Sequence, residues 1–196
     1  MRRAVLCCLP LLLGLLASCS IQQRYPGAWP RVDPTRVAGC PDVTGVYLND
    51  GVRGDPFGAL VSLSDLLQLG STSESILRIS QYGADSLAIV VWRDDRQVAR
   101  RMLSRSQGNL TCTPAGVGLT CGWHFVGREG LELGAARRTL YLAKATDGSL
   151  MVQDVEFTVG VLIVLPIIGT MRSWHRFSPT TIPPLPPAQG ESPPIE

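Results

Sequence analysis

The amino-acid sequence predicts a mainly β protein, built as an antiparallel meander that forms a small barrel or a strongly curved sheet with one short helix. Apolar and polar residues alternate with a period of two along several segments, as they do in half-buried strands. Short stretches of turn-forming residues separate these segments, and helical and strand patterns do not alternate as in parallel βαβ units. Apolar residues make up 45% of the chain and charged residues 17%, so the sequence can build a real core.

The strand patterns all fall in the middle of the chain. The expected strands are residues 43–48, 76–80, 87–92, 97–103, 119–125, 139–145, 151–159 and 171–177. In one of them Leu119, Cys121, Trp123 and Phe125 alternate with polar or small residues, so we expect these four side chains to share one buried face. Residues 87–92 are apolar on both faces, which is typical of a central strand.

Two residue pairs have the composition of tight turns. Asp94-Asp95 separates two strand patterns, and Asp147-Gly148 stands between the patterns of residues 139–145 and 151–159. Asp-Gly between two apolar runs is among the strongest local signals for a β-hairpin. Both pairs therefore predict that consecutive strands are antiparallel neighbours.

One short helix is expected after residue 62. Ser62 and Asp65 have the spacing of a capping box, with Asp in place of the preferred Glu. The leucines of residues 63–67 would then share a face, and Gly70 can supply the left-handed residue that ends a helix. A helix this short depends on packing against the sheet.

Residues 159–168 form the most apolar stretch outside the first 20 residues. The stretch is shorter than the roughly 20 residues that a membrane-spanning helix needs, and Pro166 interrupts it. We expect two buried strands that are joined near Pro166. The alternative is a loop that dips into a membrane surface.

Three cysteines lie in the expected domain. Cys112 and Cys121 flank residues 113–120, whose Pro and two Gly are typical of a hairpin loop, so we expect a Cys112–Cys121 disulfide. Cys40 would then remain as a small buried apolar residue. A bridge between Cys40 and one of the other two is the alternative pairing.

The N-terminus has the layout of an export signal. Arg2 and Arg3 precede an uncharged apolar run, residues 4–16, which is too short to span a membrane. The sequence Leu16-Ala17-Ser18-Cys19 follows directly and resembles the lipobox of bacterial lipoprotein signal peptides. This resemblance covers only the first 20 or so residues.

The resemblance to lipoproteins implies a processed and lipidated protein. Residues 1–18 would be the removed signal peptide, and Cys19 would carry a diacylglycerol and an N-acyl chain. Several acyl chains together would hold the protein on a membrane without spanning it. Ser20 follows the modified cysteine and is consistent with delivery to the outer membrane, with the folded part in the periplasm.

The remaining boundaries follow from composition. Residues 19–39 contain Pro26, Pro30 and Pro34 and are expected to be the lipidated N-terminus and an extended tether. Residues 40–177 are the expected β domain. Residues 178–196 are rich in proline and are expected to be a disordered tail.

The sequence contains no recognisable catalytic motif. His124 and His175 lack the spacing of metal ligands, so we expect no metal site and no cofactor. Asp154 and Glu156 face the same side of an expected strand and could form a carboxylate pair, but an exposed strand face explains them better.

The charge pattern excludes one class of partner. Removal of Arg2 and Arg3 would lower the formal net charge from +2 to about zero, so the chain lacks the basic character of a nucleic-acid-binding protein. A dense group of arginines could instead meet lipid phosphates. These residues are Arg93, Arg96, Arg100, Arg101 and Arg105.

A second resemblance is confined to a few residues. Gly45-Val46-Tyr47 near the start of the domain and Arg176 near its end are similar to the lipocalin arrangement, in which an arginine covers an aromatic residue of the first strand. Lipocalins have Trp where this chain has Tyr47. The resemblance implies a barrel that carries a small apolar ligand.

The expected function is therefore that of a non-enzymatic lipoprotein, anchored to a membrane and facing the periplasm. It would have a structural or interaction role in the cell envelope, with a protein or a lipid as partner. The alternatives are a lipocalin-like carrier and a hydrolase whose site forms only on folding. A carrier needs an apolar cavity, whereas an interaction protein needs a filled interior and an exposed apolar patch.

Overall fold

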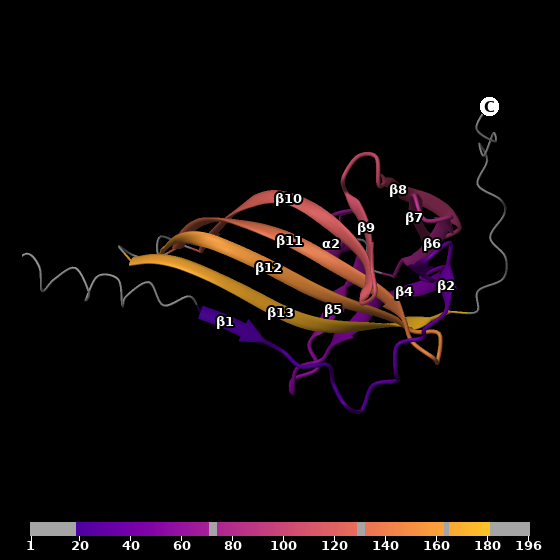
Figure 1. Cartoon of the computed structure of the whole chain (residues 1–196), viewed down its shortest axis with the longest axis horizontal. Coiled ribbons are helices and arrows are strands. Elements are labelled where there is room, and N and C mark those ends of the chain that lie inside the picture. The colour runs from indigo at the N-terminus through magenta and orange to yellow at the C-terminus, as the bar shows by residue number, and fades with distance from the viewer. Residues whose placement is uncertain (1–18, 71–73, 129–131, 163–164, 181–196) are drawn as a thin grey trace, which may run out of the picture.

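A computed structural model describes residues 19–70, 74–128, 132–162 and 165–180 (Figure 1). The fold is mainly β and antiparallel, with one short helix, as the sequence predicts. The main sheet contains β1 (Cys19–Gln22), β4 (Gly45–Arg53), β5 (Leu60–Ser62), β6 (Ile76–Tyr82), β7 (Ser86–Arg93), β8 (Arg96–Ser104), β9 (Leu110–Thr113), β10 (Gly116–Arg128), β11 (Glu132–Lys144), β12 (Leu150–Leu162) and β13 (Leu165–Pro179). A separate small sheet pairs β2 (Arg36–Val37) with β3 (Cys40–Pro41).

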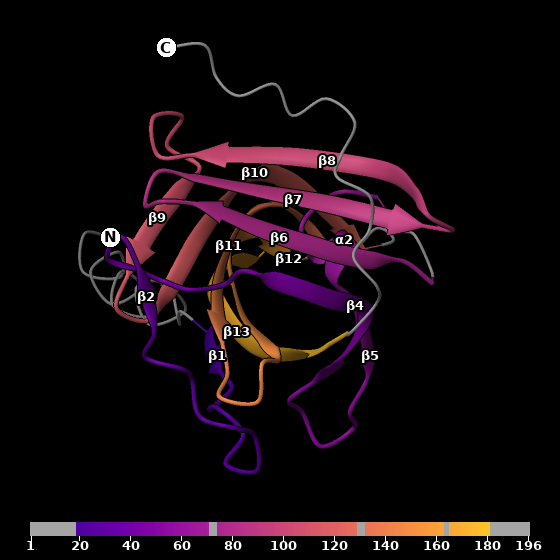
Figure 2. The ribbon, with the colours of Figure 1, turned by 90° about the vertical axis from the view of Figure 1, so that its right-hand side faces the viewer.

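The main sheet is strongly curved, but it does not close into a barrel. Its strand order is β8-β7-β6-β4-β13-β12-β11-β10-β9, and β8 and β9 are its two ends. Figure 2 shows how the sheet wraps around an interior. β10 to β13 are the longest strands, and their far ends project beyond the rest of the sheet as a four-stranded ribbon (Figure 1). We call that far end the tip.

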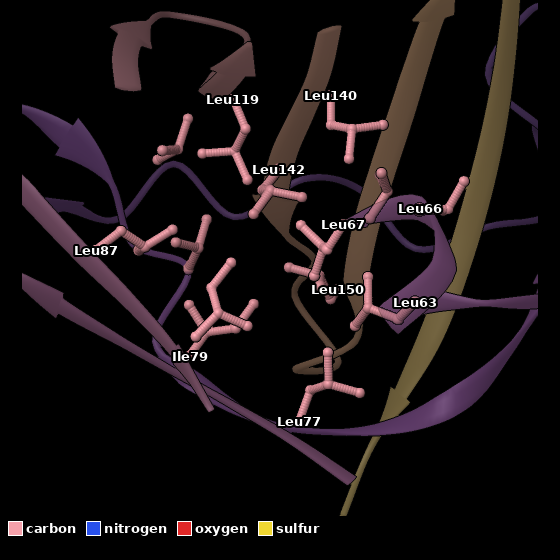
Figure 3. Close-up of a cluster of buried hydrophobic side chains, with 14 of the residues drawn as sticks. Leu63, Leu66, Leu67, Leu77, Ile79, Leu87, Leu119, Leu140, Leu142 and Leu150 are labelled. Carbon is pink, nitrogen blue, oxygen red and sulfur yellow. The ribbon is translucent and has the colours of Figure 1, made fainter. Parts of the chain in front are cut away.

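Apolar side chains fill the concave side of the curved sheet. Leu77 and Ile79 of β6 and Leu140 and Leu142 of β11 are buried there together with Leu150 of β12. The leucines of the helix α2 (Leu63–Leu66) point at this cluster from one opening (Figure 3). The curvature of the sheet thus buries one face of nearly every strand around a single core.

The helix begins as the sequence predicts and ends earlier. Ser62 Oγ accepts a hydrogen bond from the backbone N–H of Asp65 at 3.2 Å, which is the expected N-cap. Gln68, with φ of 57°, adopts the left-handed conformation soon after the helix. The expectation that Gly70 ends the helix is therefore wrong, because Gln68 takes the left-handed position two residues earlier.

Both expected turns are present. Asp94 and Asp95 have φ of 49° and 57°, and Arg93 pairs directly with Arg96 across them. Positive φ at both central residues is the geometry that matches the twist of a two-residue hairpin. Gly148 has φ of 83° in the turn between β11 and β12.

A β-bulge divides β10 into two parts, and the alternation of inward and outward side chains is reversed between them. Thr120 pairs with Thr139 and Trp123 pairs with Arg137, so two residues of β10 face one residue of β11. Leu119 and Cys121 are buried in the core, but Trp123 and Phe125 lie on the outer face and are exposed. The expectation that all four share the buried face is wrong, because the extra residue reverses the alternation.

The disulfide joins Cys40 to Cys112, and Cys121 is a buried free thiol. The expected Cys112–Cys121 bridge is wrong, and the alternative pairing is the one observed. The hairpin turn is only Pro114-Ala115, since Thr113 pairs directly with Gly116. Cys112 pairs with Val117, so Cys121 lies four residues farther along β10 and cannot reach it.

The segment of residues 19–39 is not a free tether. β1 pairs in parallel with β13, and Trp174 donates its backbone N–H to Gln23 Oε1 at 2.9 Å. Farther along, Asp33 donates its backbone N–H to the carbonyl of Lys144 at 2.7 Å. The expected spacer is therefore docked on the domain, because the edge of β13 beyond β4 offers backbone partners.

Two expected segments lie largely outside the described residues. They are the signal peptide, residues 1–18, and the disordered tail, of which only residues 178–180 are described. Those residues complete β13, and Thr180 donates its backbone N–H to Val46.

The apolar stretch 159–168 forms the adjoining ends of β12 and β13, as expected. The expectation that it is buried is wrong for the side chains that the structure describes, because Val159, Val161 and Ile168 are exposed on the outer face. Among the described residues, no helix is long and apolar enough to cross a membrane.

Candidate functional site

Polar side chains gather on the concave face where the apolar core ends and the projecting ribbon begins. The register of β11, β12 and β13 places Arg138 beside Glu156, and Asp154 beside Ser173. His175 follows on β13 and pairs with Arg53 of β4. We call this group the concave cluster; it consists of Arg53, Arg138, Asp154, Glu156, Ser173 and His175.

Arg138 holds both carboxylates of the concave cluster. Its Nε lies 3.3 Å from Asp154 Oδ1, and its Nη2 lies 3.0 Å from Glu156 Oε2. The three side chains are only 24%, 10% and 15% exposed, respectively. Burial raises the pKa of Asp154 above its usual range, and the nearby Arg138 guanidinium opposes that rise.

His175 is buried and neutral. It is 1% exposed, and its Nε2 lies 3.0 Å from Ser173 Oγ. Burial, together with the positive charges of Arg53 and Arg138, lowers the pKa of His175 to about 4. An imidazole with this pKa stays uncharged at neutral pH.

The concave cluster offers little for acid–base or nucleophilic chemistry. The expectation that Asp154 and Glu156 lie on an exposed strand face is wrong, because both are largely buried on the concave side, where each is engaged by Arg138. Ser173 is 7% exposed and its partner His175 is a weak base, which is a poor arrangement for activating a hydroxyl. The ion pairs instead help to fix the register of β11 and β12 by pairing charges across the two strands.

Sequence reasoning missed Arg138 and Arg53, although a signal for one of them exists. Arg138 has the same strand parity as the buried Leu140 and Leu142, so a charged residue falls where the pattern requires an inward side chain. An inward charge of this kind predicts an ion-pair partner on the neighbouring strand. Arg53 carries no comparable signal, because it stands at the end of β4.

The two histidines do not share a site. His124 pairs with Ala136, whereas His175 lies in the row of Val152 and Leu142, six positions away along β11. Six strand residues span roughly 20 Å. Within the described part of the chain, no group of three potential metal-ligating side chains comes together.

The lipocalin-like arrangement is not formed. Tyr47 is buried on the concave side and donates its hydroxyl to the carbonyl of Val43 at 3.1 Å. Arg176 points to the outer face, where it donates to Asp147 Oδ2 at 2.6 Å and to Ser149 Oγ at 3.3 Å. Arg176 therefore lies on the opposite side of the sheet from the aromatic ring that it would have to cover.

The arginine-rich stretch is spread over the edge strand β8 and its two flanking turns. Arg101 donates to the carbonyl of Leu67 at 2.8 Å, so it closes the core beside the helix. Arg105 pairs with Asp85 at 3.9 Å. Because neighbouring residues of a strand point to opposite faces, Arg100 and Arg101 do not form one cationic surface.

Cys19, the residue that the lipobox-like sequence would mark for acylation, lies beside the projecting ribbon. The backbone of Cys19 pairs with Gly169, and Ser20 pairs with Thr170. Ser20 is exposed, and Phe177, the residue of β13 in the apolar core, lies eight residues beyond Gly169. Position 19 is thus remote from the apolar core, and it lies two residues from the row that contains Glu156 and Arg138.

The chain was compared with protein-family models, with curated proteins and with solved structures, and none of them matches it.

Proposed function

We propose that the protein is a lipid-anchored, non-enzymatic lipoprotein that faces the periplasm and acts in the cell envelope by binding a protein or lipid partner. The N-terminal sequence supports the anchor, because charged, apolar and small residues precede Cys19 in the order of a lipobox. The single structural observation that supports the proposal is the pairing of Cys19 with Gly169, which places the acylation position beside the projecting ribbon and away from the apolar core. Acyl chains on position 19 could enter a bilayer without disturbing the buried core.

The filled interior and the exposed outer face favour an interaction role over a carrier. Leucines of α2, β6, β11 and β12 occupy the space in which a lipocalin-like carrier would hold its ligand. Exposed aromatic residues, Trp123 and Phe125 among them, stand on the outer face of the ribbon. Exposed apolar groups that gather on one face are typical of binding surfaces.

The test of the anchor uses two cysteine variants of the full chain in intact bacterial cells. Cys19→Ala should abolish incorporation of labelled fatty acid and leave a mass without lipid, whereas Cys121→Ala should retain both. Cys121 is the matched control because it is also outside the disulfide. After an alkaline carbonate wash, the Cys19 variant should be released from membranes and the Cys121 variant should remain. Wild-type protein with an unmodified Cys19, or with its leader still attached, would contradict the proposal.

A further inference from the structure

Six apolar side chains stand exposed on the outer face of the projecting ribbon. Phe125 is 95% exposed and Trp123 is 57% exposed, and the other four are between 39% and 45% exposed. They come from β10, β12 and β13. We call them the tip patch, which consists of Trp123, Phe125, Phe157, Val159, Val161 and Ile168.

The strand register brings the tip patch together. Trp123 and Phe157 lie in one row across the sheet, with their rings 6.4 Å apart, edge to face. Phe125, Val159 and Ile168 lie in the next row. The bulge in β10 turns Trp123 and Phe125 to the outer face. Without the extra residue, both aromatic side chains would point to the concave side.

The charges of the ribbon are sorted between its two faces. Asp154 and Glu156 are turned to the concave side, where both pair with Arg138. On the outer face, Arg137 lies in the row of Trp123 and Phe157, and Arg172 lies one row farther from the tip; both are exposed. The tip patch therefore meets its surroundings with apolar side chains and guanidinium groups, which complement an anionic surface.

The position of the tip patch relative to Cys19 indicates what covers it. Ser20 pairs with Thr170, and Thr170 pairs with Phe157, so the start of β1 lies in the same row as Trp123 and Phe157. Strands lie about 4.8 Å apart, which places the whole row within roughly 20 Å of the acylation position. Acyl chains at position 19 would hold this face at the level of the lipid headgroups.

We infer that the tip patch docks on the surface of an anionic phospholipid bilayer, with its aromatic side chains at the level of the headgroups. The inference rests on the proposed function, since the lipid on Cys19 is what brings the patch to the membrane. Aromatic residues favour the boundary between headgroups and acyl chains, because one part of the boundary is apolar and the other is wet. The docked sheet would carry the concave cluster on its other face, away from the lipid.

The test measures vesicle binding without the lipid anchor. Protein that starts at residue 19 and carries Cys19→Ser, so that neither acyl chains nor the apolar residues 4–16 contribute, is titrated with vesicles of phosphatidylethanolamine and phosphatidylglycerol, and in parallel with vesicles of phosphatidylcholine. Binding is expected to be stronger to the vesicles that contain phosphatidylglycerol. An added Phe125→Asp substitution should weaken it about tenfold or more, because a buried Phe side chain contributes at least about 1.5 kcal/mol. Phe57→Asp is the matched control, since Phe57 is 90% exposed in a turn outside the patch.

Two further variants resolve the geometry and the charge. Vesicles should shift the tryptophan emission to shorter wavelength, and Trp123→Phe should remove the shift while binding is retained. Arg137→Gln with Arg172→Gln should reduce the preference for phosphatidylglycerol and leave binding to phosphatidylcholine unchanged. A shift that persists in Trp123→Phe would mean that another surface meets the lipid and would overturn the inference.

The remaining outcomes separate this inference from the proposed function. If Cys19 is acylated in cells but Phe125→Asp binds vesicles as well as its parent does, the patch inference fails and the anchor stands. If Cys19 carries no lipid but Phe125→Asp still abolishes vesicle binding, the anchor fails and the patch stands. If Phe125→Asp instead converts a dimer into a monomer and no vesicles are bound, the patch is a contact between copies of the chain and the inference is wrong.

Discussion

Tyr25 stands edge-on against Trp174, with ring centroids 5.0 Å apart and ring planes at 87°. This contact joins the N-terminal segment to the outer face of β13. Tyr25 also donates its hydroxyl to the carbonyl of Pro30, which closes the turn that follows β1. The segment that leads from Cys19 is therefore held on the sheet by side chains as well as by the backbone pairing of β1.

Tyr25→Ala should loosen this segment. The edge-on pair is worth about 1 kcal/mol beyond the area that it buries, and the buried area and the hydroxyl hydrogen bond are lost as well, so the free energy of unfolding should fall by at least about 1 kcal/mol. Hydrogen exchange measured by mass spectrometry should accelerate in peptides that cover residues 19–30. Phe57→Ala, at an exposed aromatic residue, should change neither quantity. Unchanged exchange in Tyr25→Ala would mean that the contact does not hold the segment.

The disulfide should be essential for stability. It joins residues 72 positions apart, and loss of a disulfide that closes a long loop typically costs about 2–5 kcal/mol. Replacing Cys40 and Cys112 by Ser should therefore lower the free energy of unfolding by that amount, as measured by urea denaturation. A peptide map without reductant should yield a Cys40–Cys112 peptide and a free Cys121 thiol. Recovery of a Cys112–Cys121 peptide would contradict the structure.

His175 should make the stability depend on pH. Its pKa is about 4 in the folded protein and about 6.5 when the chain is unfolded, so the unfolded chain binds the proton more readily between these values. The contribution of neutral His175 is fully present above pH 6.5 and is lost as the pH falls toward 4. Thermal denaturation between pH 4 and 7 should show this slope, and His175→Gln should remove it. If the pH dependence survives in both His175→Gln and His175→Asn, another titratable group causes it.

Arg138→Met should leave two partly buried carboxylates without their cation. Breaking a buried ion pair costs about 3–5 kcal/mol, and the partial exposure of these side chains reduces the expected loss to roughly 2–3 kcal/mol at neutral pH. Loss of the guanidinium removes what opposes the raised pKa of Asp154, so the pKa should rise further. A carboxyl with a raised pKa takes up a proton more readily when folded, so the loss should diminish as the pH falls.

Neutralising the carboxylates is the control for that experiment. Adding Asp154→Asn and Glu156→Gln to Arg138→Met should recover most of the stability, because the buried charges are then absent. Denaturant titrations of the single, double and triple variants measure the coupling between Arg138 and each carboxylate. If Arg138→Met alone is as stable as the wild-type protein, the ion pairs contribute nothing and the account of the concave cluster is wrong.

Local patterns predicted most of the fold. Period-two alternation located most of the long strands, and a run that is apolar on both faces located β7. Asp94-Asp95 and Asp147-Gly148 located two hairpins. These features depend on a few neighbouring residues, so one sequence suffices to find them. The N-cap at Ser62 was predictable for the same reason, since its hydrogen bond joins residues three positions apart.

Features that depend on distant pairing were mispredicted. The pairing of Cys40 with Cys112 follows from the path of β3 past β9, which no local pattern reveals. The bulge opposite Arg138 adds one residue without any Gly-rich or Pro-rich mark that periodicity could detect, apart from Gly122. The docking of residues 19–39 was missed because its prolines favour an extended chain, and an extended chain is equally able to follow a sheet edge.

The length of β13 sets the two ends of the described chain apart. Cys19 lies beside Gly169, and β13 then runs ten residues farther to Pro179, which corresponds to roughly 33 Å along the strand. If acyl chains hold Cys19 at the lipid, β13 is a rigid connection between the anchored residue and Pro179, unlike a flexible linker. An affinity tag or fluorophore appended beyond Pro179 would then lie well away from the acylated residue, where it can be captured or quenched without touching the anchored end.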